Sequence, residues 1–198
     1  MTIGHTRVEV REESIASLVD YARIPIAFEV RRVFDVIAPG GDPVDSDLEE
    51  RELDVPYWKD YDALDGGGPS RLVGQFDVSN WVVLSARVGP DRVGGAIVAF
   101  DTPGVWMLEG RRDLAVVWDI RVLPEARGRG VGTALFRAAE AWAVARGCRQ
   151  LKVETQNINV PACQFYRRQG CVLRRVNPLA YPELPDEVQL LWYKEVVA

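Results

Sequence analysis

The stretch ARGRGVGTAL, residues 126–135, places three glycines and two arginines directly before an apolar run. Gly128, Gly130 and Gly132 leave backbone N–H groups uncovered, and the residues after them are typical of a helix. A helix N-terminus presents unpaired N–H donors and the positive end of the helix dipole, which together suit an anion. The stretch therefore predicts a phosphate-binding loop, and the alternative is a glycine-rich turn whose arginines are solvated.

The spacing of the glycines excludes two common phosphate loops. A P-loop needs GxxxxGK[ST], and no lysine follows any of these glycines. A dinucleotide fingerprint needs a third glycine where this chain has Thr133. What remains is Arg127-x-x-Gly130-x-Gly132, between an apolar strand at 114–122 and the helix.

Length and charge narrow the class of protein. A chain of 198 residues with 47% hydrophobic content can bury one core, so we expect a single domain over residues 1–198. The formal net charge of −5 argues against a nucleic-acid partner, which needs basic clusters. It suits a small cationic substrate better.

Cysteine and histidine usage excludes other chemistry. The three cysteines form no CxxC pair, which indicates a reducing compartment with thiols used as core residues. No signal-peptide core and no run of eighteen apolar residues is present, so we expect a cytoplasmic protein without a membrane partner. The only histidine is His5, close to the N-terminus, which disfavours a metal site or a Ser/His/Asp triad.

The pattern along the chain predicts an α/β (α+β) protein. Segment 26–37 favours a strand, with a helix as the alternative, and segment 39–70, rich in Gly, Pro and acids, is expected to form a long loop or short helices. Further strands are expected at 7–11, 81–88, 92–100, 114–122, 150–156, 171–176 and 187–196, and helices at 14–23, 131–146 and 159–169.

Two motifs resemble the GNAT superfamily of N-acetyltransferases. The glycine loop resembles its acyl-CoA pyrophosphate loop, and Asn159-x-x-Ala162-x-x-Phe165-Tyr166-x-x-x-Gly170 resembles its other hallmark. The resemblance covers about residues 77–196. It implies the GNAT acyl-CoA N-acyltransferase fold, with a central mixed, mostly antiparallel sheet flanked by helices. It also implies acetyl-CoA as co-substrate and no metal.

The same resemblance implies the cofactor site. In these enzymes the asparagine helps to hold the pantetheine arm, and the tyrosine protonates the departing thiolate. Asn159 could instead be a plain helix cap, and Tyr166 a buried tyrosine near a helix end. The implied acetyl-CoA-binding residues are Ile120, Val122, Arg127, Gly128, Arg129, Gly130, Val131, Gly132, Thr133, Asn159 and Tyr166.

A closer resemblance is to the streptothricin acetyltransferases. It rests on residues 57–62 (YWKDYD), 118–120 (WDI), 154–163 (ETQNINVPAC) and 186–193 (DEVQLLWY). Cys171 is a departure, since such enzymes usually carry Phe there. The resemblance implies a small cationic amine as acceptor, with streptothricin the named candidate. Residues 1–76 would then supply acceptor-side elements, including a long acidic loop, and residues 77–196 the catalytic core.

Two carboxylates are candidates for the general base. An alkyl ammonium has a pKa near 10, so a carboxylate must accept its proton, directly or through water. Glu154 lies on a predicted core strand, twelve residues before Tyr166, and Asp119 lies on the strand before the glycine loop. Either acid could instead bind the cationic acceptor, or be exposed or paired with an arginine.

Two other functions stay open from the sequence. One is a GNAT enzyme that acetylates a protein N-terminus or a lysine. The other is a non-catalytic acyl-CoA sensor, against which the retention of Tyr166, Asp119 and Glu154 speaks. In proteins of this fold the final strands often meet a partner chain, so the resemblance allows a homodimer, while the sequence leaves the oligomeric state open.

Overall fold

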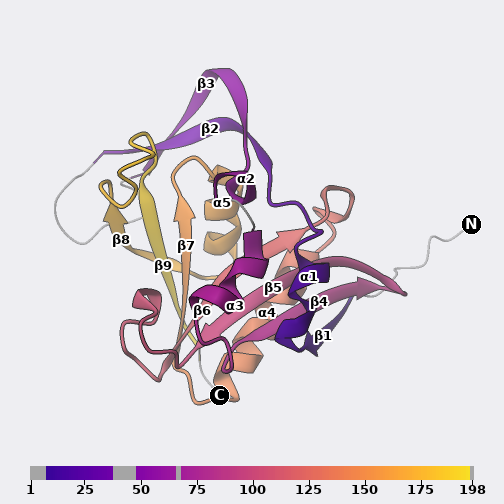
Figure 1. The fold of residues 1–198 in the computed structure, drawn as a ribbon. Helices are drawn as coiled ribbons and strands as arrows, with labels where there is room; N and C mark the ends of the chain where they lie inside the picture. The colour runs from indigo at the N-terminus through magenta and orange to yellow at the C-terminus, as the bar shows by residue number, and fades with distance from the viewer. Residues whose placement is uncertain (1–7, 38–47, 66–67, 197–198) are drawn as a thin grey trace, which may run out of the picture.

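A seven-stranded sheet in the order β1-β4-β5-β6-β7-β9-β8 forms the body of the protein (Figure 1). The computed structural model describes residues 8–37, 48–65 and 68–196. Neighbouring strands are antiparallel except for β6 and β7, which are parallel. The strands of this sheet are β1 (Glu9–Glu13), β4 (Val82–Val88), β5 (Asp91–Phe100), β6 (Leu114–Val122), β7 (Gln150–Gln156), β8 (Val172–Asn177) and β9 (Gln189–Glu195).

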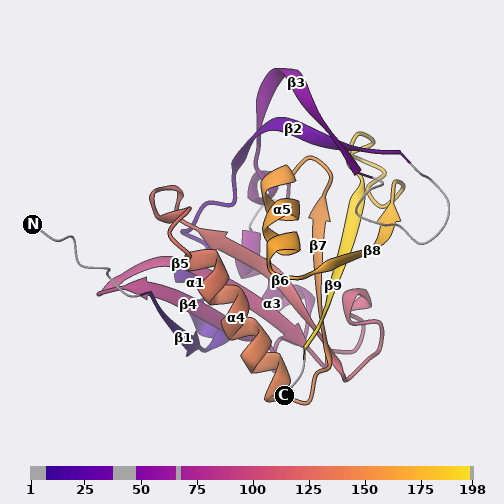
Figure 2. The same ribbon diagram turned by 180° about the vertical axis from the view of Figure 1, so that it is seen from behind.

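Helices cover both faces of the sheet. The two longer helices, α4 (Val131–Val144) and α5 (Val160–Arg168), lie on one face (Figure 2). The short helices α1 (Leu18–Tyr21) and α3 (Leu72–Gln75) lie on the other (Figure 1). The remaining short elements are α2 (Tyr61–Asp65) and 3₁₀ turns at Ile15–Ser17, Gly68–Arg71, Trp106–Leu108 and Pro124–Ala126. The mixed, mostly antiparallel sheet flanked by helices is thus confirmed.

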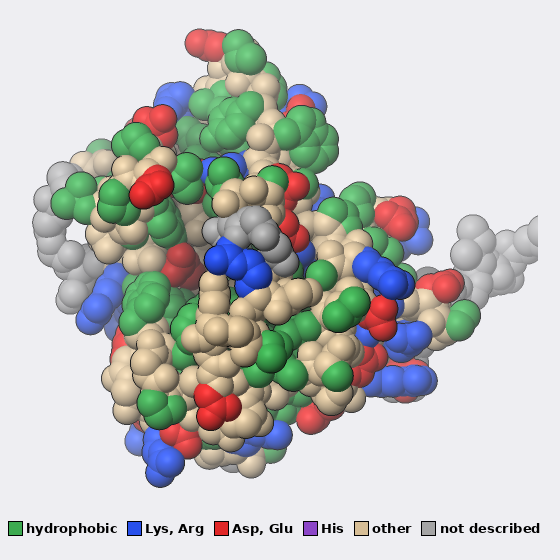
Figure 3. All heavy atoms as spheres, in the orientation of Figure 1, with side chains coloured by type: hydrophobic (Ala, Val, Ile, Leu, Met, Phe, Trp, Pro, Cys, Tyr) green, Lys and Arg blue, Asp and Glu red, His purple; other side chains and the backbone are tan. Residues whose placement is uncertain are grey.

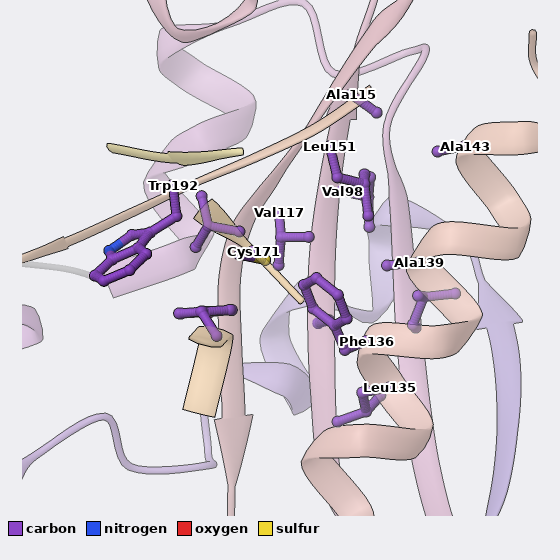
Figure 4. Packing of buried hydrophobic residues seen from close by; sticks show 14 of the residues in the cluster. Val98, Ala115, Val117, Leu135, Phe136, Ala139, Ala143, Leu151, Cys171 and Trp192 are labelled. Atoms are coloured by element: carbon purple, nitrogen blue, oxygen red, sulfur yellow. The ribbon is translucent and has the colours of Figure 1, made fainter. Parts of the chain in front are cut away.

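The larger core lies between the sheet and α4. Figure 4 shows Leu135, Phe136 and Ala139 of α4 turned toward the strands. They meet short aliphatic side chains such as Val98 and Val117, and all of these residues are at most 3% exposed. Because these strands are apolar on both faces, they can be covered on both sides, and a second core with Leu18, Tyr21 and Leu72 fills the opposite face.

A two-stranded hairpin corrects the expectation of a long acidic loop. Strand β2 (Phe28–Val36) pairs antiparallel with β3 (Leu48–Lys59), and the hairpin arches over one end of the sheet (Figure 1). Most side chains of β3 are exposed, so its apolar residues do not alternate as in a half-buried strand. Cross-strand ion pairs, including Arg51 to Asp35, join it to β2. Residues 38–47 and 66–67 lie outside the described residues. Tyr61–Asp65 and Gly68–Arg71 form the short helices that the composition allowed.

Gly95 on β5 allows Tyr21 of α1 to lie flat on the sheet. A Cβ at this position would come within 2.8 Å of both the Tyr21 ring and the Leu84 carbonyl oxygen. The carbonyl belongs to the neighbouring strand and cannot move away without breaking the β4–β5 ladder. The absence of a side chain at residue 95 therefore sets the distance between α1 and the sheet.

We expect Gly95→Ala to lower the free energy of unfolding by about 1–3 kcal/mol, as overpacking of a tight core does. The matched control is Gly74→Ala in α3, where an added Cβ has no atom within 4 Å. That change should leave stability unchanged or raise it by up to about 1 kcal/mol. Urea unfolding of the two variants measures the difference, and equal effects would contradict the close approach at Gly95.

Candidate active site

The candidate site is an opening in the sheet between β6 and β7. These parallel strands pair only from Leu114–Gln150 to Val117–Val153. Beyond these pairs, β6 continues from Trp118 to Val122 beside β5, while β7 continues from Glu154 to Gln156 beside β9. The facing edges of the two strands therefore carry backbone groups without a strand partner, which can bind another molecule. Helix α5 lies over the region where they part (Figure 2).

A β-bulge in β6 decides which side chains face the opening. Val117 pairs with Val98 and Asp119 pairs with Ile97, which leaves Trp118 as the extra residue. Ile97 packs in the core beneath α1 and α3, and its paired neighbour Asp119 shares that face. Trp118 packs on the same side against Phe76 and Trp81. The bulge thus turns two consecutive residues, one aromatic and one acidic, toward the face opposite α4.

The glycine loop ends directly at the N-terminus of α4. Gly128 and Gly130 have φ angles of +72° and +82°, and an added Cβ at either would meet no atom within 4 Å. The first bond to the helix runs from the Ala134 N–H to the Gly130 carbonyl at 2.9 Å, so the N–H groups of residues 131–133 are the unpaired first turn. This exposed cradle of N–H groups, with room beside it, fits a pyrophosphate.

The other predicted cofactor residues line the same end of the opening. Arg127, Gly128, Arg129 and Gly130 are exposed, and the Arg127 Nε donates to the Val122 carbonyl at 3.2 Å. Val131 is buried beneath the helix. Gly132 faces the Phe165 ring, and the Thr133 hydroxyl accepts a hydrogen bond from Gln169 at 3.4 Å. The loop and the C-terminal end of α5 are therefore neighbours.

Helix α5 brings Asn159 and Tyr166 to the opening. The Asn159 Oδ1 accepts from the Ala162 N–H at 3.2 Å, as a helix cap does. Tyr166 is 4% exposed and packs against Phe136 and Phe165. Burial raises its pKa well above the usual value, and the charge of the nearby Asp119 carboxylate adds to the effect. Among the described residues its hydroxyl has no hydrogen-bond partner, so the phenol keeps a proton that it can donate.

Among the described residues, Glu154 accepts hydrogen bonds only from neutral donors. The Tyr181 hydroxyl donates to its Oε1 at 2.5 Å, and the Gln189 Nε2 donates to its Oε2 at 2.9 Å. Burial raises the pKa of Glu154, while these two hydrogen bonds and the charge of Lys152 lower it, and the net shift is upward. A carboxylate without an ion pair and with a raised pKa is suited to accept a proton.

Asp119 is held by a cation. The Arg121 Nε and Nη2 lie 2.8 and 2.7 Å from its Oδ2, and the other side of the same guanidinium binds Asp62 in a bidentate pair. Arg121 also donates to the Ile24 carbonyl at 3.1 Å. Burial raises the pKa of Asp119 although Arg121 opposes it. The arginine-paired alternative considered for this acid is therefore what the structure has, and the cluster contains two carboxyl groups for one guanidinium.

The hairpin is anchored beside these acids. Glu187 is 5% exposed and binds the Lys59 ammonium, and the Tyr61 hydroxyl donates to its other oxygen at 2.7 Å. The Asn157 Nδ2 donates to the Phe34 carbonyl of β2 at 3.0 Å. Hydrophobic side chains gather on the hairpin, and acidic side chains come to the surface below it (Figure 3). The hairpin and α2 thus border the face that carries Glu154 and Asp119.

Several of these residues were not predicted from the sequence. Arg121, Tyr181, Gln189 and Glu187 hold the two acids and the hairpin. The only available signals were a charged residue on an apolar strand and the run DEVQLLWY. Tyr21 was also missed, and its buried hydroxyl beside Asp119 has no hydrogen-bond partner of normal geometry.

Other expectations fall outside the site. Cys148, Cys163 and Cys171 are buried and free, and burial raises the pKa of the Cys171 thiol to about 12, which suits core residues rather than nucleophiles. Within the described ranges, no group of three His, Cys, Asp or Glu residues could hold a metal ion. Nor does the described part of the chain contain a helix long and apolar enough to cross a membrane. His5 lies outside the described residues.

Comparison with known proteins identifies the class. The sequence pattern of the Acetyltransferase (GNAT) family matches residues 46–171, and the chain belongs to this family. It is 46% identical to the streptothricin acetyltransferase of Streptomyces lavendulae over 146 residues, which cover 73% of this chain and 70% of that protein. It is 29% identical to the Escherichia coli enzyme of that name over 192 residues, 94% of each chain.

Solved structures agree on the fold. Nourseothricin acetyltransferase superposes with a TM-score of 0.71 at 24% identity, covering 96% of this chain and 99% of that one. A Bacillus anthracis protein assigned as a streptothricin acetyltransferase, solved in complex with acetyl coenzyme A, superposes with a TM-score of 0.73 at 22% identity over the same shares. The protein is a GNAT N-acetyltransferase with acetyl-CoA as its co-substrate.

We expect Gly130→Val to weaken acetyl-CoA binding about tenfold or more, which corresponds to about 1.4 kcal/mol. The side chain would occupy the space beside the N–H cradle, at a φ angle that valine avoids. Gly104→Val is the matched control, because Gly104 has a φ of +80° and equally open surroundings, in the connection between β5 and β6. Calorimetry on both variants separates loss of the cradle from backbone strain, and an unchanged affinity in Gly130→Val would contradict the loop assignment.

Proposed function

We propose that this enzyme acetylates a primary amine of a small cationic molecule, and that streptothricin is such an acceptor. The observation that carries the proposal is the 46% identity to the Streptomyces lavendulae streptothricin acetyltransferase over 146 residues. The half-buried, unpaired carboxyl group of Glu154 on the face opposite α4 supports it, because a cationic amine needs a proton acceptor there. The activity would confer resistance to that antibiotic.

In this proposal acetyl-CoA and the acceptor bind from different sides of the sheet. Residues 128–133 bind the pyrophosphate of acetyl-CoA, and Asn159 contacts its pantetheine arm. Ile120 and Val122 on the open edge of β6 offer backbone groups to the same arm. The hairpin and α2, both within residues 1–76, border the acceptor side, whereas residues 77–196 form the catalytic core. A cytoplasmic location agrees with the three free buried cysteines.

The proposed mechanism uses one acid and one base. Acetyl-CoA supplies an activated thioester. Glu154 takes a proton from the acceptor ammonium, directly or through water, which leaves a neutral amine able to attack the acetyl carbon. Backbone N–H groups on the open edge of β6 stabilise the charge that develops on the acetyl oxygen. Tyr166 gives its proton to the thiolate as the C–S bond breaks. The attacking nitrogen loses its second proton, which restores the Tyr166 phenol through water, and Glu154 releases the first proton to solvent, so charge and protons balance.

Asp119 takes a different role in this scheme. Its ion pair with Arg121 makes it a poorer proton acceptor than Glu154, since protonation would cost the pair. The excess negative charge of the cluster of Asp119, Arg121 and Asp62 instead attracts the ammonium group of the acceptor. We therefore assign proton transfer to Glu154 and electrostatic attraction to Asp119.

Replacement of Tyr166 tests the acid. We expect Tyr166→Phe to lower kcat by about 10²-fold or more across pH 6–9, as for the loss of a general acid. The phenol is protonated over this whole range because burial raises its pKa. Acetyl-CoA affinity, measured by calorimetry, should change little and reports that α5 still folds. Turnover equal to the wild type would remove Tyr166 from the mechanism.

Direct assay tests the acceptor. With acetyl-CoA and streptothricin, we expect mass spectrometry to detect one added acetyl group. The acceptor KM should rise with salt, because ions screen charge attraction over about 8–10 Å. Glu154→Gln serves as the inactive control, and a neutral-bodied peptide serves as the alternative acceptor. Clear acetylation of the peptide with none of streptothricin would favour a protein acetyltransferase instead.

A further inference from the structure

The connection between β8 and β9, residues 178–188, reaches the candidate base from outside the two motifs. Two backbone hydrogen bonds order it, from the Leu184 N–H to the Tyr181 carbonyl at 3.0 Å and from the Glu187 N–H to the Leu184 carbonyl at 2.9 Å. The Val188 N–H donates to the Asn157 Oδ1 at 2.8 Å, which ties the end of the connection to the end of β7. The segment that carries Tyr181 is therefore fixed by hydrogen bonds at both its turn and its end.

The hydrogen bonds around Tyr181 have one consistent direction. The Gln156 Nε2 donates to the Tyr181 hydroxyl oxygen at 3.0 Å, so that oxygen is already used as an acceptor. The hydroxyl group then uses its single proton to donate a hydrogen bond to the Glu154 Oε1. Gln189 donates to the other carboxyl oxygen. The carboxyl group is thus held from two directions, and both donors favour its charged form.

The described charged groups around Glu154 are bound to other partners and do not hydrogen-bond its carboxyl group. Lys152 on β7 is bound to Glu109 at 2.8 Å. Asp119 on β6 is bound to Arg121. Glu187, in the connection between β8 and β9, is bound to Lys59. On α2, the Tyr61 hydroxyl donates a hydrogen bond to Glu187. Tyr181 and Gln189 are therefore the only described groups that hydrogen-bond Glu154.

We propose that Tyr181 is a positioning residue for acetyl transfer, which holds the Glu154 carboxylate ionised and oriented toward the opening. The inference rests on the proposed function, because it assumes that Glu154 is the base. The same connection holds Lys59 and Tyr61 through Glu187, so one segment fixes the base and the end of the hairpin that borders the acceptor side.

Tyr181→Phe tests the inference. Without the donated hydrogen bond the carboxylate is less stable, so the pKa of Glu154 should rise above its already raised value. Activity requires the carboxylate and is lost as pH falls through this pKa. The acid limb of kcat/KM for streptothricin should therefore move upward by about one pH unit. Titration of the ¹³C-labelled Glu154 carboxyl by NMR, assigned with Glu154→Gln, should move in the same direction.

The matched control is Tyr193→Phe. The Tyr193 hydroxyl donates to the Glu109 Oε1 at 2.5 Å, the same length as the bond from Tyr181 to Glu154. Tyr193 itself pairs with Lys152, in the part of β7 that is still paired with β6. This variant should leave both the Glu154 titration and the acid limb unchanged. Acetyl-CoA affinity in all variants reports that the fold is intact.

The outcomes separate the inference from the function on which it rests. An upward shift of both the Glu154 titration and the acid limb supports the role of Tyr181. An unmoved Glu154 titration in Tyr181→Phe overturns it and leaves the assignment of the base intact. A shifted titration with an unmoved acid limb overturns Glu154 as the base, and the positioning role with it.

Discussion

The end of the pairing between β6 and β7 is the constraint on which the rest of the site depends. Only four residue pairs join these strands, although β6 is nine residues long and β7 seven. The bulge at Trp118 begins where the pairing stops, and it keeps β6 paired with β5 while its other edge is open. The edges can stay open because the flanking strands and helices supply the packing that this pair loses. The unpaired backbone edges then lie between the two faces of the sheet.

The two faces have different chemistry because different elements cover them. On the α4 and α5 side, apolar packing surrounds Tyr166 and keeps its phenol protonated. On the other side, short helices and the hairpin leave room for acids, and the covering segments supply the groups that hold them. Glu154 has neutral partners and Asp119 has a cation, so the environments separate two carboxylates of similar intrinsic acidity. Proton transfer and charge attraction can therefore be assigned to different residues.

The sequence predicted the part of the molecule whose chemistry is local. The glycine loop, the strand before it and the Asn159 cap depend on residues close in sequence, and the structure has each of them. Strand β3 was missed because it is formed by backbone pairing with β2, while most of its side chains are exposed and do not alternate in polarity. The partners of the acids were missed because they lie far from the acids in sequence. Tyr181 is 27 residues from Glu154, and Asp62 is 59 residues from Arg121.

The number of acids in residues 42–65 does not by itself predict the electrostatic attraction at the site. Counted along the chain, ten acids face Arg51 and Lys59, which suggests a strongly negative surface. Among the described residues, Glu50 is bound to Arg32 and Asp62 to Arg121. The segment's own cations, Arg51 and Lys59, bind Asp35 and Glu187, which lie outside it. Attraction for a cationic acceptor therefore depends more on where an acid lies than on how many acids the segment contains. Because exposed pairs contribute little field beyond the Debye length, the buried cluster of Asp62, Arg121 and Asp119 has more influence on the acceptor than the longer acidic segment.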